Sequence, residues 1–125
     1  MTVDERVHAE LPILDEQYLS EVSEGDVHFE KELFHDFFDL VPELISSLEK
    51  GIEENDADQA HRAAHSLRGS ARCIGAKRVG IVCDSLVMKA REGDLSNMNS
   101  LLEQLRKNIA ELKSFIEKEW GSIAA

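Results

Sequence analysis

The sequence predicts an all-α protein, an antiparallel up-and-down four-helix bundle with a short N-terminal capping helix. No segment alternates apolar and polar residues with the period of two that marks a half-buried strand. Apolar residues instead recur every three or four positions over most of the 125 residues. Short polar or glycine-containing stretches separate the helical segments, and long amphipathic helices joined by short turns pack antiparallel.

We expect a short first helix from Glu10 to Val22, followed by a long second helix from about Val27 to Glu54. Gly25 and Asp26 lie between them, where glycine ends one helix and aspartate caps the next. Pro42 lies inside the second helix and predicts a kink. The apolar spacing carries across it, so we keep this helix continuous. Its apolar residues are Leu33, Phe34, Phe37, Val41, Leu44, Ile45, Leu48 and Ile52.

The third helix follows Asp56, which forms a plausible capping pair with Gln59. Gly75 ends it after Ile74, and we expect a fourth helix from Ala76 to Glu92 and a fifth from Leu95 to about Trp120. The third helix carries a core stripe at spacings of four and three, namely Ala60, Ala64, Leu67, Ala71 and Ile74. The domain then spans residues 10–120, with a flexible N-terminal tail over residues 1–9 and a C-terminal tail over residues 121–125.

The net charge of −11 conceals a basic segment between Arg62 and Arg91. That segment holds seven cations and one acid, Asp84, for a net charge of +6, so the rest of the chain carries −17. A protein this acidic is a poor general binder of nucleic acid. The basic segment suggests a small anionic target, such as a phosphate or an acidic pocket on a partner. The alternative is a solvated charged face.

Other features point to an intracellular protein. No run approaches the roughly 18 apolar residues of a membrane span, and the N-terminus lacks a secretory pattern. Cys73 and Cys83 lie ten residues apart without a metal-binding spacing, so we expect reduced, buried thiols rather than a disulfide or a zinc pair. We therefore expect a cytoplasmic protein.

The segment from Ala64 to Ala71 (AHSLRGSA) combines His65 with a cation three residues later and a glycine four residues later. These positions share one helix face. Glycine inside a helix costs about 1 kcal/mol relative to alanine, so Gly69 needs a reason, and the close approach of a large partner to His65 is one. At about 100° per residue, His65 projects about 140° from the centre of the core stripe, Gly69 about 180° and Arg68 about 80°.

The third and fourth helices resemble the histidine-containing phosphotransfer (HPt) domain of two-component phosphorelays, over roughly Leu33 to Ile116. In that family a histidine accepts a phosphoryl group from the aspartyl phosphate of a receiver domain and passes it to another receiver. The residues that carry the resemblance are the segment from Ala64 to Ala71, Ile74-Gly75-Ala76, Val79, Cys83, Leu86, Arg91-Glu92-Gly93-Asp94 and Val41-Pro42-Glu43-Leu44.

By this resemblance His65 is the phosphorylated histidine, Gly69 the glycine that lets the receiver approach, and Arg68 stands where the family usually has lysine. Arginine keeps the charge and adds bidentate phosphate geometry. Val87 occupies the place where some members have a glutamine that holds the imidazole, so Arg91 or a backbone group is expected to substitute. We expect phosphate stabilisation by Arg68, Arg72 and Arg91, and receiver docking through His61, Gly69, Gly75, Lys77, Arg78 and Phe38.

The expected protein is a monomeric, free-standing phosphocarrier rather than an enzyme. It holds no metal or cofactor, and the receiver supplies magnesium and the catalytic groups. Its partners are response-regulator receivers and a hybrid histidine kinase, with no nucleic acid and no membrane. Two other interpretations stay open. One is a helical adaptor that docks through the basic segment without phosphoryl chemistry; the other is a metal-binding bundle built on the pair His61 and His65.

Overall fold

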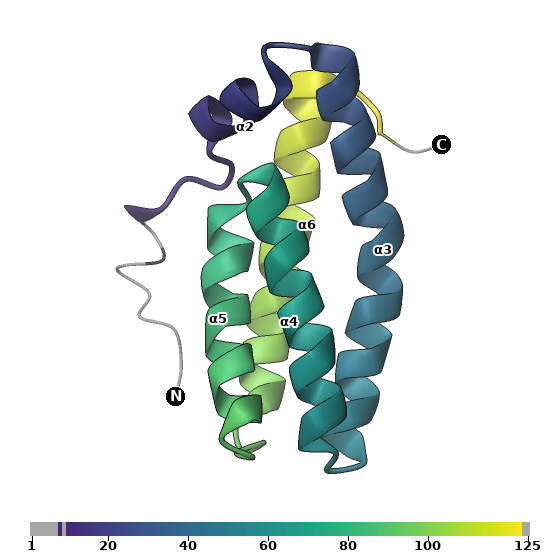
Figure 1. The fold of residues 1–125 in the computed structure, drawn as a ribbon, viewed down its shortest axis with the longest axis vertical. Helices are drawn as coiled ribbons and strands as arrows, with labels where there is room; N and C mark the ends of the chain where they lie inside the picture. Colours follow the sequence, from purple (N-terminus) through teal and green to yellow (C-terminus); the bar gives the residue numbers. More distant parts are fainter. Residues whose placement is uncertain (1–7, 9, 124–125) are drawn as a thin grey trace.

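Four long helices lie side by side and alternate in direction, and a shorter helix crosses one end of them (Figure 1). The computed structural model describes residue 8 and residues 10–123. Contacts join α3 to α4, α4 to α5, α5 to α6 and α6 back to α3, which closes the antiparallel bundle. The helices are α2 (Glu16–Ser23), α3 (Val27–Glu53), α4 (Ala57–Ile74), α5 (Lys77–Arg91) and α6 (Met98–Trp120).

Side-chain caps set the beginnings of α3 and α4 as expected. Asp26 accepts a hydrogen bond from the backbone N–H of Phe29, and Asp56 accepts one from Gln59, both at 3.1 Å. Each bond satisfies a backbone donor that has no partner within its helix. The continuous path of α3 across Pro42 is confirmed.

The expected start of the first helix was wrong. Residues 11–15 are not helical, and α2 begins at Glu16 with Asp15 as its cap, at 3.0 Å from the backbone nitrogen of Tyr18. The Asp15 N–H instead donates to the Gly75 carbonyl at 2.8 Å. A long-range backbone bond therefore ties this segment to the turn between α4 and α5, and tertiary contact overrides the local helical pattern.

The last helix also begins later than expected, at Met98 rather than at Leu95. Asn97 has a left-handed φ of 61°, which a helix interior does not allow. Asp94 accepts hydrogen bonds from the hydroxyl and the backbone N–H of Ser96, and these, with the ammonium of Lys89, lower the pKa of Asp94 to about 2. A polar turn thus occupies the first residues that we assigned to this helix.

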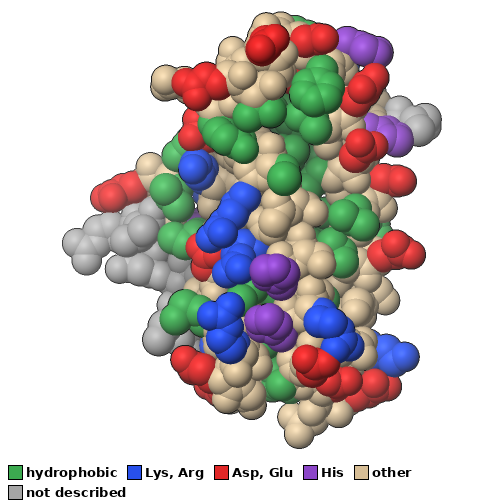
Figure 2. Space-filling view, viewed as in Figure 1, with side chains coloured by type: hydrophobic (Ala, Val, Ile, Leu, Met, Phe, Trp, Pro, Cys, Tyr) green, Lys and Arg blue, Asp and Glu red, His purple; other side chains and the backbone are tan. Residues whose placement is uncertain are grey.

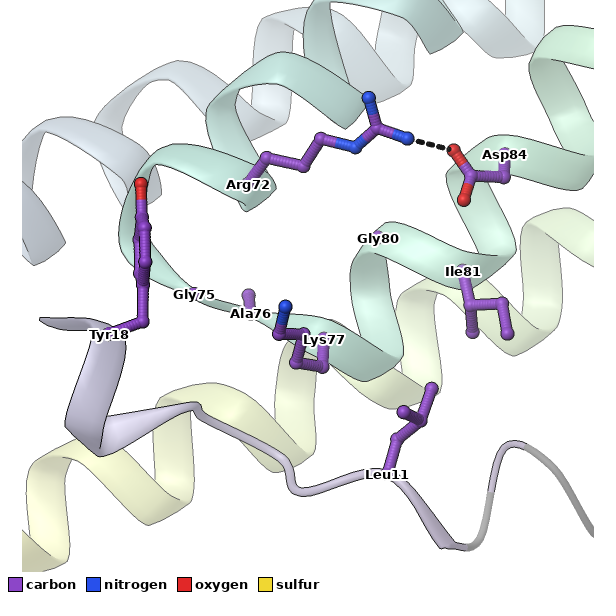
Figure 3. A pocket seen from close by; sticks show the side chains of 9 residues that line it. All are labelled: Leu11, Tyr18, Arg72, Gly75, Ala76, Lys77, Gly80, Ile81 and Asp84. Carbon is purple, nitrogen blue, oxygen red and sulfur yellow. Dashed lines mark hydrogen bonds and ion pairs between the residues drawn. The ribbon is translucent and has the colours of Figure 1, made fainter.

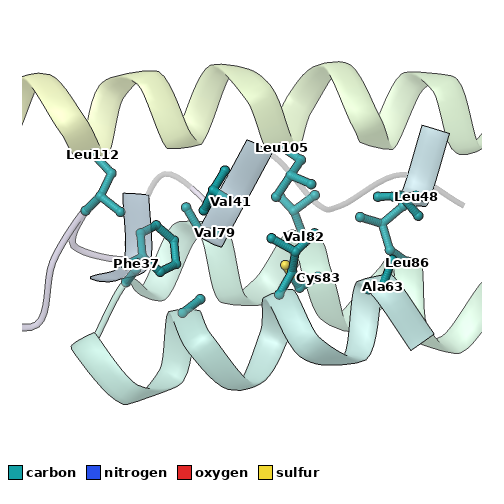
Figure 4. Close-up of a cluster of buried hydrophobic side chains, with 14 of the residues drawn as sticks. Phe37, Val41, Leu48, Ala63, Val79, Val82, Cys83, Leu86, Leu105 and Leu112 are labelled. Carbon is teal, nitrogen blue, oxygen red and sulfur yellow. The ribbon is translucent and has the colours of Figure 1, made fainter. Parts of the chain in front are cut away.

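The apolar stripes of the long helices meet in one core (Figure 4). All five residues of the predicted α4 stripe are buried. Gly51 lets α3 approach α4 closely, because a Cβ atom at this position would lie 2.7 Å from the backbone nitrogen of Ala60. The core therefore fixes which face of α4 is left for solvent.

The short helix α2 covers the end of the bundle where α4 turns into α5 (Figure 1). Leu14 and Leu19 are buried there. The buried carboxylate of Glu30 accepts hydrogen bonds from the Ser23 hydroxyl at 2.6 Å and from the indole N–H of Trp120 at 3.0 Å, which links α2, α3 and α6.

The two tails are only partly described. Of the expected N-terminal tail, residues 1–7 and 9 lie outside the described residues. At the other end Ile123, which we placed in the C-terminal tail, is buried against the core. Among the described residues, no helix combines the length and the apolar character needed to cross a bilayer.

Candidate functional site

His65 lies on the outer face of α4 and is exposed, as the angular spacing predicts. The buried stripe formed by Ala64, Leu67 and Ala71 lies against the core, so the opposite side of the same helix turns toward solvent. The position of the imidazole thus follows from the packing of its helix neighbours.

Arg68 holds the imidazole. One of its terminal nitrogens, Nη2, lies 3.1 Å from His65 Nδ1. Because a guanidinium donates hydrogen bonds and cannot accept them, Nδ1 is the acceptor. The Arg68 side chain is only 19 % exposed, so its position is well restricted by its surroundings. The residue that contacts the imidazole is thus Arg68, and not Arg91 or a backbone group as we expected, while Val87 is buried in the core.

Asp84, on the facing side of α5, binds Arg68 and Arg72. Its Oδ1 accepts a hydrogen bond from Arg72 Nη2 at 2.9 Å, and Figure 3 shows this contact. The same oxygen lies 3.8 Å from Arg68 Nη1. A chain of contacts thus runs from Arg72 through Asp84 and Arg68 to His65.

His61 lies one turn before His65, and the two rings stack with centroids 6.0 Å apart and planes 13° from parallel. His61 is half-buried, and its Nε2 atom is buried without a hydrogen-bond partner among the described residues. Figure 2 shows two adjacent histidine side chains over α4, with Lys and Arg side chains beside them.

Gly69 leaves the helix surface beside His65 bare. Among the described residues, no atom beyond its immediate chain neighbours and the helix backbone lies within 4 Å of where a Cβ atom would stand, so these residues give no packing reason for glycine here. A partner can approach the helix backbone at this point.

Two of the expected docking residues are engaged in the fold. Arg78 donates from Nε to the Leu11 carbonyl at 2.7 Å and lies 4.0 Å from Glu111. Gly75 is buried, with a left-handed φ of 79° at the end of α4. Both residues hold the turn between α4 and α5 against neighbouring segments, and their part in docking stays a prediction.

The other expected residues vary in their surroundings. Lys77 is half-exposed and lies 3.8 Å from Asp15. Arg91 is exposed and makes no hydrogen bond or ion pair with a described residue. Phe38 is half-buried and packs edge-to-face on Phe37 at 5.1 Å. Because Gly51 faces Ala60 in the antiparallel pair of α3 and α4, Phe38 lies nearer the Ile74 end of α4 than His65 does.

A cleft of about 460 Å³ opens next to Arg72 and Asp84, between the N-terminal segment and the α4–α5 hairpin (Figure 3). Its walls combine the cationic side chains of Arg72 and Lys77 with apolar side chains such as Leu11 and Ile81. The lining residues are Leu11, Tyr18, Arg72, Gly75, Ala76, Lys77, Gly80, Ile81 and Asp84.

The two cysteines differ. Both are free thiols, and Cys83 is buried as expected, but Cys73 is exposed, so the expectation of burial was wrong for it. Burial, with a smaller contribution from the nearby Asp84 carboxylate, raises the pKa of the Cys83 thiol to about 12. Cys83 is therefore an unreactive core residue.

Sequence reasoning counted Asp84 but gave it no role. The signal was present, because Asp84 is the single acid in a segment of net charge +6.

Within residues 8 and 10–123, no three His, Cys, Asp or Glu side chains cluster in a way that could hold a metal ion.

An exposed histidine held by an arginine, on the outer face of a four-helix bundle and beside a bare glycine, suggests a phosphotransfer site. The model of the Hpt domain family matches residues 32–115. The chain belongs to the Hpt domain family. This Hpt match covers all of α4 and α5, and therefore His65 and the residues around it.

Two similar proteins accompany this family match. The phosphorelay intermediate protein rdeA of Dictyostelium discoideum is 27 % identical over 109 residues, which are 85 % of this Hpt chain and 43 % of rdeA. The chain thus spans less than half the length of that relative. The crystal structure of histidine-containing phosphotransfer protein B (HptB) from Pseudomonas aeruginosa PAO1 aligns with a TM-score of 0.80 and 27 % identity, over 87 % of this chain and 95 % of HptB.

Proposed function

We propose that His65 accepts a phosphoryl group from the aspartyl phosphate of a receiver domain and passes it to a second receiver. The observation that carries the proposal is the exposed imidazole with Arg68 at 3.1 Å from its Nδ1 atom, beside the open helix surface at Gly69. Membership of the Hpt domain family supports the same chemistry.

In the transfer step, the bond from phosphorus to the aspartyl oxygen breaks and a bond from phosphorus to a ring nitrogen forms. The carboxylate leaves with the electron pair. A neutral imidazole is a nucleophile at physiological pH. Arg68 occupies the Nδ1 side of the ring, so we assign the phosphoryl group to the other ring nitrogen, Nε2. For this attack the ring proton moves from Nε2 to Nδ1 through water, which frees the lone pair of Nε2.

Phosphoryl transfer needs positioning and charge neutralisation more than covalent help from the protein. Arg68 contacts the imidazole, and Arg72 binds the same Asp84 carboxylate as Arg68. We therefore assign both arginines to neutralising the charge of a phosphoryl group at His65, together with Arg91, an exposed cation of the same segment. We propose that the receiver supplies the magnesium ion and the remaining catalytic groups, so that this chain acts as a carrier and not as an enzyme by itself.

We propose a monomer that works in the cytoplasm with receivers and a hybrid histidine kinase. His65 and the side chains around it come from one chain, so a second copy is not needed to complete the site. The two free thiols suit a reducing compartment. Light scattering of the purified chain tests the monomer, and a dimer would contradict it.

The direct test incubates the chain with a panel of phosphorylated receiver domains and magnesium. We expect wild type to gain phosphate from at least one receiver, and His65→Gln to gain none. The matched control is His28→Gln, which removes an exposed imidazole at the start of α3 and should still be labelled. If His65→Gln gains as much acid-labile phosphate as wild type, the assignment is wrong. If wild type binds a receiver without gaining phosphate, the chain is an adaptor.

A further inference from the structure

We propose that Asp84 is a positioning residue that weakens the hold of this protein on its phosphoryl group, by competing with that group for Arg68 and Arg72. The proposal rests on phosphotransfer at His65. It assigns a role to the one acid in the basic segment, and it predicts that the carrier is biased toward passing its phosphate on.

The contacts of Asp84 place it in this competition. Its Oδ1 atom receives the hydrogen bond of Arg72 at 2.9 Å and lies 3.8 Å from Arg68 Nη1. The other terminal nitrogen of Arg68 is the one at 3.1 Å from His65 Nδ1. A single carboxylate thus neutralises part of the charge of Arg68, which contacts the imidazole, and of Arg72.

The chemistry of the ring releases Arg68 during transfer. The contact of the guanidinium with Nδ1 requires a lone pair on Nδ1, which places the ring proton on Nε2. Attack by Nε2 requires a lone pair there instead, so Nε2 gives up its proton and Nδ1 gains one. Protonated Nδ1 cannot accept from Arg68. The released guanidinium then has two anions within reach, Asp84 and the phosphoryl group on His65.

The same carboxylate also acts as a nearby negative charge. A phosphoryl group carries a charge close to −2 at neutral pH, so it attracts both arginines and is repelled by Asp84. The Asp84 and Arg72 side chains are 40 % and 61 % exposed, so solvent screens these interactions. Exposed ion pairs of this kind change an equilibrium constant about two- to fivefold.

The test measures the end-point ratio of phosphorylated chain to phosphorylated receiver, for wild type and Asp84→Asn. Asparagine keeps the shape and an acceptor oxygen but loses the charge. We expect the ratio to rise two- to fivefold in Asp84→Asn. The increase should shrink at 1 M salt, where the screening length is about 3 Å. A purely structural role for Asp84 would change thermal stability but give no salt-sensitive shift of this ratio.

Two further variants decide the outcome. Glu49→Gln makes the same charge change at a carboxylate that pairs with Arg106 between α3 and α6, and should leave the ratio unchanged. Arg72→Gln removes one of the contested cations and should lower the ratio; it also tests the proposal if Asp84→Asn does not fold. An unchanged or lower ratio in folded Asp84→Asn, or an equal increase in Glu49→Gln, overturns the proposal. Failure of wild type to accept any phosphate would instead overturn the proposed function.

Discussion

Gly69 lies inside α4, and beyond its two chain neighbours no side chain of a described residue lies within 4 Å of where its Cβ atom would be. In a helix interior, glycine lowers stability by about 1 kcal/mol relative to alanine. Gly69 therefore lowers the stability of the fold, and no contact with a described residue compensates for it. We therefore expect that glycine at position 69 benefits the binding of a partner, because it leaves room for a receiver to approach His65.

Substitutions at Gly69 should thus separate folding from transfer. We expect Gly69→Ala to raise the free energy of unfolding by up to about 1 kcal/mol, and Gly69→Leu to fold as well as wild type. Gly69→Leu should slow phosphoryl transfer about a hundredfold, because a bulky side chain displaces the docked receiver. Denaturant unfolding and receiver-dependent labelling measure the two effects. Equal transfer rates in wild type and Gly69→Leu would contradict the docking role.

Cys83 provides a pH-dependent prediction. Its pKa is raised from 9.0 to about 12 in the folded chain, so between these values the folded state binds more protons than the unfolded state. The free energy of unfolding should therefore fall as the pH rises from about 9 toward 12. Measuring the free energy of unfolding of wild type and Cys83→Ala across this pH range isolates the contribution of the Cys83 thiol, because the variant has no thiol at this position. Parallel curves for the two proteins would contradict it.

At the residue scale, the sequence predicted the exposure of His65 and the neighbouring Arg68, because both follow from helix spacing. It did not predict that Arg78 donates a hydrogen bond to the Leu11 carbonyl, or that Asp84 bridges Arg68 and Arg72. Those contacts join segments distant in the chain, and residue spacing within one helix carries no information about them.

At the scale of the helices, Gly51 sets the distance between α3 and α4. A Cβ atom there would meet the backbone of Ala60 at 2.7 Å, and backbone atoms cannot move aside without separating the helices. We expect Gly51→Ala to lower the free energy of unfolding by about 1–3 kcal/mol, the usual cost of overpacking.

Gly80→Ala is the matched control for this prediction. Gly80 lies inside α5, and among the described residues no atom outside its own helix backbone and chain neighbours would stand within 4 Å of its Cβ. Its substitution should leave stability unchanged or raise it by up to about 1 kcal/mol. Chemical denaturation compares the two variants. Equal stability of Gly51→Ala and wild type would show that α3 and α4 do not depend on this close approach.

Helix order and most boundaries were predictable, because capping residues such as Asp26 and Asp56 act locally. The two wrong boundaries, at the starts of α2 and α6, have different physical reasons. The first depends on the long-range bond from Asp15 to Gly75. The second depends on the left-handed backbone of Asn97 and the Asp94–Ser96 contacts. Neither is visible in the apolar periodicity of the sequence.

At the scale of the whole molecule, the bundle separates a buried apolar core from an outer face of α4 that carries histidines and cations. The helix α2 and the Glu30 contacts close one end, and the core fixes the outer face of α4. On that face the histidine pair lies beside cations (Figure 2), although the protein as a whole carries a net charge of −11. These cations would attract the phosphoryl group that we propose at His65.

The most direct test of this assignment locates the phosphate on the chain. After incubation with a phosphorylated receiver and magnesium, the protein is digested at alkaline pH, where phosphohistidine survives, and the modified peptide is sequenced by mass spectrometry. The structure predicts one phosphate, on His65, and none on His61. Phosphate on His61 or on any other residue in place of His65 would contradict it.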